Sequence, residues 1–155
     1  MKPKVLFICV HNSARSQMAE SWLNHRCGEF FEAQSAGLEP GTLNPLAVEV
    51  MQEIGIDISE KETRAVSDVL NSGARFDYVI AVCDESSAEK CPIFPGPAKR
   101  LHWSFPDPSR VIGTTDEKLA QVRKIRDEIF AKIDNWCAPF AHELARCRRS
   151  DYREA

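Results

Sequence analysis

An eight-residue stretch near the N-terminus has the residue types needed for nucleophilic chemistry on an anion. It reads Cys9-Val10-His11-Asn12-Ser13-Ala14-Arg15-Ser16. The five residues between Cys9 and Arg15 can turn their backbone N–H groups inward and form an anion-binding nest. Arg15 adds a planar guanidinium that suits a tetrahedral oxyanion. Such surroundings favour the thiolate of Cys9, which is the nucleophilic form of cysteine. We therefore predict an oxyanion site built around Cys9.

The segments on either side of this stretch predict how it is held. The apolar run 5–8 is typical of a buried parallel strand, and residues 17–23 have the pattern of the first turns of a helix ending at Gly28. The positive end of that helix would face the loop. A buried cysteine with an arginine nearby by chance is the alternative. The order of strand, cysteine, loop, arginine and helix favours the oxyanion site.

The rest of the chain alternates between strand-like and helix-like segments. We expect further strands over 30–36, 78–82 and 99–103, and helices over 45–54, around 68–70, and from 114 or 115 onward, with Pro139 kinking or interrupting the last helix. This alternation predicts an α/β fold: an open four-stranded parallel sheet with helices on both faces, in a three-layer flavodoxin-like or Rossmann-like arrangement. Residues 1–145 would form a single domain, and residues 146–155 a disordered tail.

Two further cysteines can take part in thiol chemistry with Cys9. Cys83 follows the third predicted strand, so it would share a sheet edge with Cys9 if those strands are neighbours. Seven residues separate Cys91 from Cys83, in a polar segment that can close on itself at low entropic cost. Thiolate attack would pass a disulfide along these three sulfurs. Alternatively, Cys83 is a small core residue and Cys91 is incidental.

Asp107 is the candidate acid. It lies between two prolines that stiffen its backbone, in the loop after the last predicted strand. Nearby aromatic residues would raise its pKa and suit it to donate a proton to a leaving oxygen. A simple turn aspartate before a proline is the alternative.

The composition excludes several classes of function. The 155 residues are 43% hydrophobic and 28% charged, which fits one globular soluble domain, and the net charge of −3 argues against nucleic-acid or membrane-surface binding. The chain has no apolar run near 18 residues, and its N-terminus leads directly into the first strand, so we expect a cytoplasmic protein. In that setting, six cysteines indicate redox or metal chemistry. We expect Cys27 and Cys137 to be helix-packing residues, and Cys147 has no assigned role.

The sequence resembles the thioredoxin-coupled arsenate reductases built on the low-molecular-weight protein tyrosine phosphatase fold, over nearly the whole chain to about residue 135. The resemblance rests on residues 9–20, 35–37, Cys83 and 91–92, and 102–108. It implies that Cys9 attacks arsenate held by Arg15 and the loop amides of residues 10–16, while Asp107 protonates the departing oxygen. Cys83 would then attack Cys9 and release arsenite, and Cys91 would form a disulfide with Cys83 that thioredoxin reduces. The implied role is arsenic detoxification, with no cofactor.

The sequence departs from the family in ways that bear on its partners. The spacing from Cys83 to Cys91 is one residue longer than in typical members, so glutaredoxin is an alternative reductant to thioredoxin. Some members bind potassium through residues matching Asn12, Glu20 and Ser35 with an aspartate. Here the aligned segment 63–65 offers an arginine instead, so we expect no metal site.

Two other functions use parts of the same residue set. A phosphatase acting on phosphate monoesters would need Cys9, Arg15 and Asp107 but neither Cys83 nor Cys91. The alanine at position 14 and the absence of tyrosines in the segment directly after Pro108, which reads Ser109-Arg110, weaken that interpretation. A non-catalytic redox or metal sensor would use Cys83, Cys91 and His102, but zinc ligand pairs are usually two to four residues apart.

Overall fold

The computed structural model describes residues 2–83 and 97–151, with residues 141–151 described by their backbone alone. Its centre is a parallel sheet of four strands, β1 (Lys4–Cys9), β2 (Glu32–Gly37), β3 (Tyr78–Ala81) and β4 (Lys99–His102). The strand order is β2-β1-β3-β4. The predicted four-stranded parallel sheet of an α/β fold is therefore confirmed.

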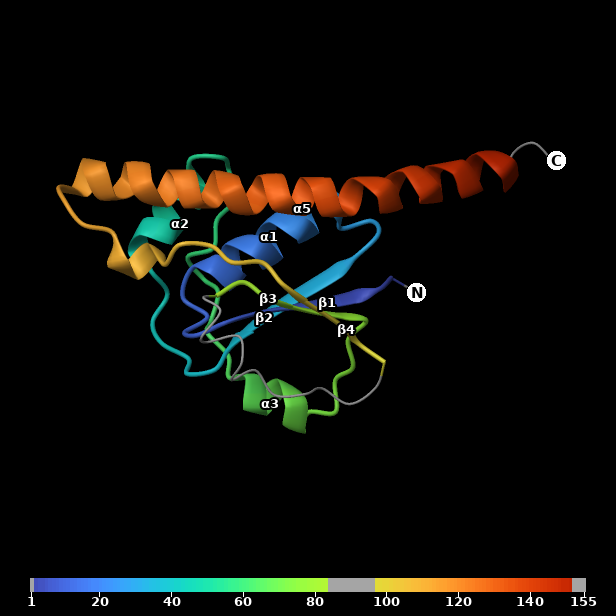
Figure 1. Ribbon diagram of the computed structural model, residues 1–155, viewed down its shortest axis with the longest axis horizontal. Helices are drawn as coiled ribbons and strands as arrows, with labels where there is room; N and C mark the ends of the chain where they lie inside the picture. The colour runs from blue at the N-terminus through green and yellow to red at the C-terminus, as the bar shows by residue number, and fades with distance from the viewer. Residues whose placement is uncertain (1, 84–96, 152–155) are drawn as a thin grey trace.

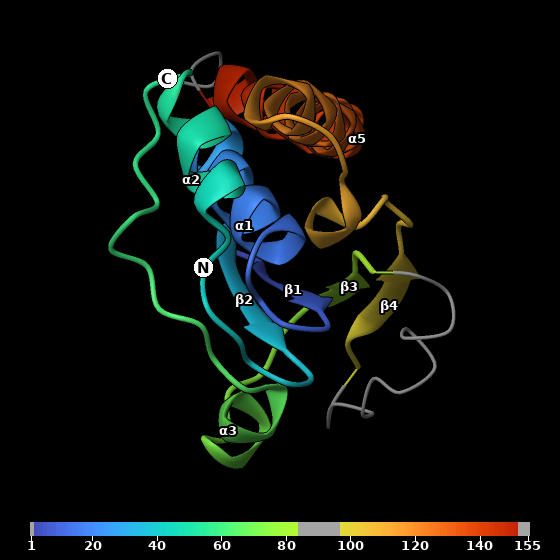
Figure 2. The ribbon, with the colours of Figure 1, turned by 90° about the vertical axis from the view of Figure 1, so that its left-hand side faces the viewer.

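Helices cover both faces of the sheet, as expected. On one face lie α1 (Arg15–Cys27), α2 (Pro45–Gln52) and the long α5 (Thr115–Asp151), and on the other lies α3 (Val66–Asn71) (Figures 1 and 2). A short 3₁₀ helix, η1 (Pro108–Arg110), precedes α5. No helix in the described part of the chain has the length and apolar character to cross a bilayer.

After the exposed Lys4, the sequence of β1 is apolar throughout, because the strand is central in the sheet. Alternate side chains of a strand point to opposite faces of the sheet. Val5 and Phe7 join the larger core beneath α1 and α5, whereas Leu6 and Ile8 join a smaller cluster with residues of α3. Since both faces of β1 are buried, its side chains have no reason to alternate between apolar and polar.

The last helix differs from the prediction in two ways. It continues through Pro139 without a break, and the backbone of residues 146–151, where we expected a disordered tail, is helical. Aromatic packing holds the helix around the proline: Trp136 lies 5.0 Å from the ring of Phe31, and Phe140 lies 6.3 Å from the ring of Tyr78. The segment beyond the proline is rich in alanine, glutamate, leucine and arginine, which favour helix.

Cys27 and Cys137 are joined by a disulfide, which the sequence did not predict. The bond connects the end of α1 to α5 across 110 residues, with the two Cα atoms 6.8 Å apart. The expectation that they are only helix-packing residues is therefore corrected: they are buried between helices and also cross-linked. Nearby, the Trp22 ring of α1 stacks on Phe130 of α5 at 4.0 Å.

The sheet topology determines where a ligand can bind. Starting from β1, the chain first places β2 on one side and then β3 on the other, so the strand order changes direction between β1 and β3. Open α/β sheets bind ligands at the carboxyl ends of the strands next to such a point. Cys9 is the last residue of β1, and Cys83 comes two residues after β3.

Candidate active site

The loop after β1 turns its peptide N–H groups inward because its carbonyl groups are held from outside. The carbonyl oxygens of Cys9, Val10, His11 and Ser13 accept hydrogen bonds from backbone N–H groups in the segment 38–44, at 2.7–3.0 Å. In a trans peptide the C=O and the following N–H point in opposite directions. The N–H groups that follow these carbonyls therefore face the inside of the loop, where an oxyanion would bind.

The Cys9 sulfur lies inside this ring of donors. The side chain is buried and its thiol is free, and the sulfur receives the Asn12 N–H at 3.1 Å. The Ser16 hydroxyl lies 2.8 Å from the same sulfur. When Cys9 is a thiolate it has no hydrogen to give, so Ser16 must be the donor. Both contacts stabilise the charged, nucleophilic form of the sulfur.

Two backbone features keep the loop in this shape. Asn12 has a φ of 54°, in the left-handed region that asparagine tolerates better than most residues. Gly37 at the end of β2 lies against the loop: a Cβ atom there would come within 3.0 Å of backbone atoms of Val10, His11 and Asn12. Since those neighbours are backbone atoms, any larger residue at position 37 would displace the loop.

Arg15 begins α1 and reaches into the site from its far end. Its side chain is buried, and Nη1 donates to the Phe105 carbonyl at 3.1 Å. Nη2 lies 3.9 Å from the Asp107 carboxylate. The helix behind it has no side-chain cap, because its N-cap residue is Ala14. A guanidinium and an uncapped helix N-terminus thus adjoin the Cys9 loop, a combination that attracts oxyanions.

Asp107 lies next to Arg15, but the pKa of Asp107 shifts in the opposite direction to the one we expected. Burial raises the pKa of Asp107, yet hydrogen bonds from the backbone and hydroxyl of Ser109 and the charges of Arg15 and Arg110 together lower the pKa below its usual value. The predicted increase in pKa from aromatic neighbours is therefore wrong. With no anion bound, Asp107 is a carboxylate at neutral pH, so it must gain a proton before it can act as an acid.

Cys83 is buried two positions beyond the last residue of β3 that pairs with β1. The N–H of Val82 donates to the Ile8 carbonyl at 2.8 Å, which places the chain carrying Cys83 beside the chain carrying Cys9. His102 of β4 contacts the Cys83 carbonyl through Nε2 at 2.7 Å. A carbonyl can only accept, so Nε2 is the donor. Cys91 lies outside the described residues.

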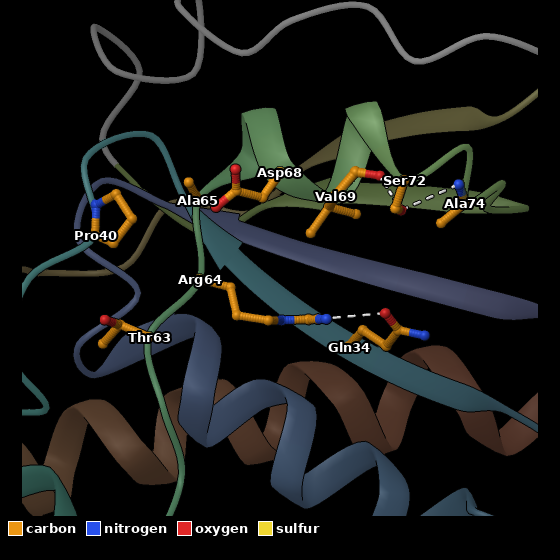
Figure 3. Close-up of a pocket in the computed structure, with 9 residues that line it drawn as sticks. All are labelled: Gln34, Pro40, Thr63, Arg64, Ala65, Asp68, Val69, Ser72 and Ala74. Atoms are coloured by element: carbon orange, nitrogen blue, oxygen red, sulfur yellow. Dashed lines mark hydrogen bonds between the residues drawn. The ribbon is translucent and has the colours of Figure 1, made fainter.

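The segment 61–65 places two of the chain's own cations near the loop. Lys61 forms an ion pair with Glu20, and Arg64 donates to the Ser35 carbonyl and to Gln34 (Figure 3). Thr63 and Arg64 also line a cavity of about 300 Å³ between β2 and α3. Among the described residues, no group of three or more histidine, cysteine or acidic side chains could hold a metal ion.

The structure brings most of the predicted site residues together. Residues 9–16 form the loop, Asp107 adjoins Arg15, and Cys83 follows the strand that neighbours the one ending at Cys9. Sequence reasoning missed the roles of Gly37 and of the Phe105 carbonyl. A glycine directly after a strand was a usable signal, because close approach of two backbones often requires one. A backbone carbonyl gives no such signal.

The chain matches known proteins over most of its length. The family model for low molecular weight phosphotyrosine protein phosphatases matches residues 4–149. An arsenate reductase from Bacillus subtilis (strain 168) is 45% identical over 131 residues, covering 83% of this chain and 91% of the relative.

Solved structures share the fold at lower identity. A thioredoxin-dependent arsenate reductase from Corynebacterium glutamicum is 31% identical with a TM-score of 0.59, covering 86% of this chain and 62% of that chain. A low molecular weight protein tyrosine phosphatase from T. tengcongensis is 27% identical with a TM-score of 0.71, covering 89% of this chain and 99% of that chain.

Proposed function

The chain belongs to the low molecular weight phosphotyrosine protein phosphatase family, and from that premise we propose that it reduces arsenate to arsenite. One observation supports the proposal: Cys9 lies in a loop whose peptide N–H groups face inward, and a second buried cysteine, Cys83, follows the adjacent strand. A phosphatase needs the loop but has no use for the second sulfur. Reduction needs both, because two electrons must come from two thiols.

In the first proposed step, the Cys9 thiolate attacks arsenic. The loop amides and Arg15 hold the arsenate oxygens and neutralise their charge as the As–S bond forms. The hydroxyl group of hydrogen arsenate leaves as water by taking one proton from Asp107. The bound anion shares Arg15 with Asp107 and adds negative charge beside it, which favours the protonated carboxyl. The product of this step is a Cys9–arsenic adduct plus water.

In the second step, the Cys83 thiolate attacks the Cys9 sulfur. The S–As bond breaks and its electron pair stays on arsenic, which falls from As(V) to As(III) and leaves as arsenite. Cys9 and Cys83 are then joined as a disulfide. The parallel pairing of β1 with β3 supports this step because it keeps the two cysteines on neighbouring strand ends.

In the third step, the Cys91 thiolate attacks Cys83 and frees Cys9. The Cys83–Cys91 disulfide would then be reduced by the dithiol of thioredoxin in the cytoplasm, with glutaredoxin as the alternative partner. The likeness to the thioredoxin-dependent reductase supports the first of these partners. The proposed biological role is arsenic detoxification.

The test is arsenate-dependent NADPH oxidation with thioredoxin and thioredoxin reductase. We expect turnover by the wild type, and about a single turnover by Cys91→Ser, whose Cys9–Cys83 disulfide is not resolved. The control is Cys147→Ser, which removes a cysteine from outside the proposed relay and should turn over like the wild type. Equal turnover by the wild type and Cys91→Ser would contradict the relay.

Hydrolysis of phosphate monoesters is the second candidate. The uncapped N-terminus of α1 and the Arg15 guanidinium beside the Cys9 loop favour it as well as they favour reduction. Cys83→Ser separates the two functions. The variant should lose arsenate reduction and keep any hydrolysis of p-nitrophenyl phosphate. If the wild type hydrolyses that ester and shows no arsenate-dependent oxidation with thioredoxin or glutaredoxin, the protein is a phosphatase.

A further inference from the structure

Gln17 is a buried polar side chain that the proposed reaction does not use. It lies in the first turn of α1, is 1% exposed, and is directed away from solvent toward the back of the Cys9 loop. Its Nε2 donates to the Asn12 side-chain oxygen and to the Glu62 carbonyl, both at 3.1 Å. The Glu62 carbonyl can only accept, which fixes the orientation of the Gln17 amide.

The contact from Gln17 also fixes the orientation of the Asn12 amide. The Asn12 side-chain oxygen accepts two hydrogen bonds, one from Gln17 and one from the backbone N–H of Arg64 at 3.0 Å. The Asn12 Nδ2 must then point the other way, and it donates to the Ser16 hydroxyl at 2.7 Å. With its oxygen engaged as an acceptor, Ser16 has its own hydrogen left for the Cys9 sulfur.

These contacts form a directional chain of donors from Gln17 through Asn12 and Ser16 to Cys9. Asn12 also donates its backbone N–H to the same sulfur, from a left-handed conformation that needs support. We propose that Gln17 is a positioning residue that holds Asn12 so that both donors point at the Cys9 sulfur. The inference rests on the proposed role of Cys9 as the nucleophile.

The proposal predicts that Gln17 affects the nucleophile more than it affects anion binding. Oxyanion affinity depends on Arg15 and on loop peptides that the segment 38–44 holds independently of Gln17. The hydrogen bonds to the sulfur depend on Asn12. A variant lacking the Gln17 amide should therefore show a slower chemical step with nearly unchanged affinity for inorganic phosphate.

Gln17→Met provides the test, because methionine has a similar length and helix preference but no donor. We expect alkylation of Cys9 by iodoacetamide, followed by mass spectrometry of the Cys9 peptide, to slow about tenfold at neutral pH. We expect kcat for arsenate reduction to fall by a similar factor, and the Kd for phosphate to stay within twofold of the wild type. Because alkylation needs no arsenate, it tests Gln17 even if the protein does not reduce arsenate.

Gln121→Met is the matched control. Gln121 also donates through Nε2 to two carbonyls, those of Ile112 and Glu117, but on the exposed side of α5. This variant should match the wild type in Cys9 alkylation, kcat and phosphate affinity. Combining Gln17→Met with Ser16→Ala should cost less than the sum of the two single losses, because both changes remove the Ser16 contact and only Gln17→Met also affects the Asn12 N–H.

Two results would overturn the proposal. One is a cooperatively folded Gln17→Met protein whose Cys9 alkylation rate and kcat stay within twofold of the wild type. The other is loss of cooperative unfolding both in Gln17→Met and in Gln17→Glu, which has the same shape but no donor. That second result would make Gln17 a residue needed for folding rather than for positioning Asn12.

Discussion

The Asp107 carboxylate lies 3.9 Å from the guanidinium of Arg15, so the candidate acid and the candidate anion-binding residue are paired with each other. Arg15 is also held by the Phe105 carbonyl, two residues before Asp107. A bound oxyanion would take over part of the Arg15 contact. Substrate binding would thereby weaken the interaction that keeps Asp107 ionised, at the moment when a proton is needed.

Asp107→Asn should slow the first chemical step while preserving anion binding. An amide cannot supply the proton, so we expect the rate of Cys9–arsenic adduct formation to fall about a hundredfold. Rapid mixing of arsenate with the protein, quenched and analysed by mass, measures this rate. Phosphate should bind at least as tightly as to the wild type, because a competing carboxylate is gone. An unchanged rate would remove Asp107 from the mechanism.

The lowered pKa of Asp107 predicts how its contribution to stability depends on pH. Burial alone raises that pKa, but the Ser109 hydrogen bonds and the Arg15 and Arg110 charges outweigh it. A group whose pKa is lower in the folded state stabilises the fold above its unfolded pKa and loses this effect as pH falls through its folded pKa. Asp107→Asn should therefore lower Tm slightly at pH 7, and the difference should close below about pH 4. A difference that widens in acid would contradict the sign of the shift.

Gly37→Ala should damage the site without removing any functional group. The new methyl would meet the Asn12 nitrogen at 2.7 Å and the His11 carbonyl carbon at 2.8 Å, so the loop must move. We expect phosphate affinity, measured by calorimetry, to fall at least about tenfold, because misplaced loop donors cost binding energy. Gly41→Ala is the matched control, since its methyl would make ordinary contacts with the His11 side chain, the nearest at 3.5 Å. Equal affinities for the two variants would refute the argument.

The disulfide between Cys27 and Cys137 should contribute to stability and not to catalysis. It closes a loop of 110 residues, and such cross-links typically stabilise a fold by about 2–4 kcal/mol. A protein with serine at both positions should unfold at lower urea concentration than the oxidised wild type. The urea concentrations at which the two proteins unfold should become similar when a strong thiol reductant is present throughout. Turnover with thioredoxin should be the same for both.

The ion pair of Lys61 with Glu20 leads us to expect that the stability of the protein does not depend on potassium. The Lys61 ammonium pairs with Glu20, and the Arg64 guanidinium contacts the Ser35 carbonyl, so internal cations engage two positions that resemble potassium-binding ones. Melting temperatures in equal concentrations of KCl and NaCl should agree for the wild type. Lys61→Gln leaves Glu20 without this cation and should lower the melting temperature in both salts. A stabilising effect of potassium on the wild type would show that the site accepts an ion.

The four strands and the Cys9 loop could be predicted because each is encoded by a short stretch of neighbouring residues. All four strands begin and end within two residues of the predicted bounds. The short apolar run 5–8 indicates a buried strand from local sequence alone. The cysteine at the end of that strand, with the loop and arginine that follow, allows few conformations for the connection to α1. Parallel pairing of β1 with β3 then brings Cys83 toward Cys9, although 74 positions separate them in the sequence.

What could not be predicted depends on contacts between distant segments. The pKa of Asp107 responds to Arg15 from the other end of the chain, and Cys27 meets Cys137 only because α1 packs on α5. Pro139 lowers helix propensity locally, but the aromatic packing of Trp136 outweighs that effect. Gln17 looked like an ordinary helix residue, because its hydrogen bonds cross from one segment to another.

The burial of Cys9 also has a consequence for the lifetime of the protein. Only 3% of this residue is exposed, and the loop whose peptide N–H groups face inward surrounds its sulfur. Overoxidation of a cysteine by peroxide to sulfinic acid depends on access to the sulfur as well as on its charge. Burial should therefore protect Cys9 from bulky oxidants that would attack a surface thiol, whereas oxidants small enough to enter the loop can still reach its sulfur.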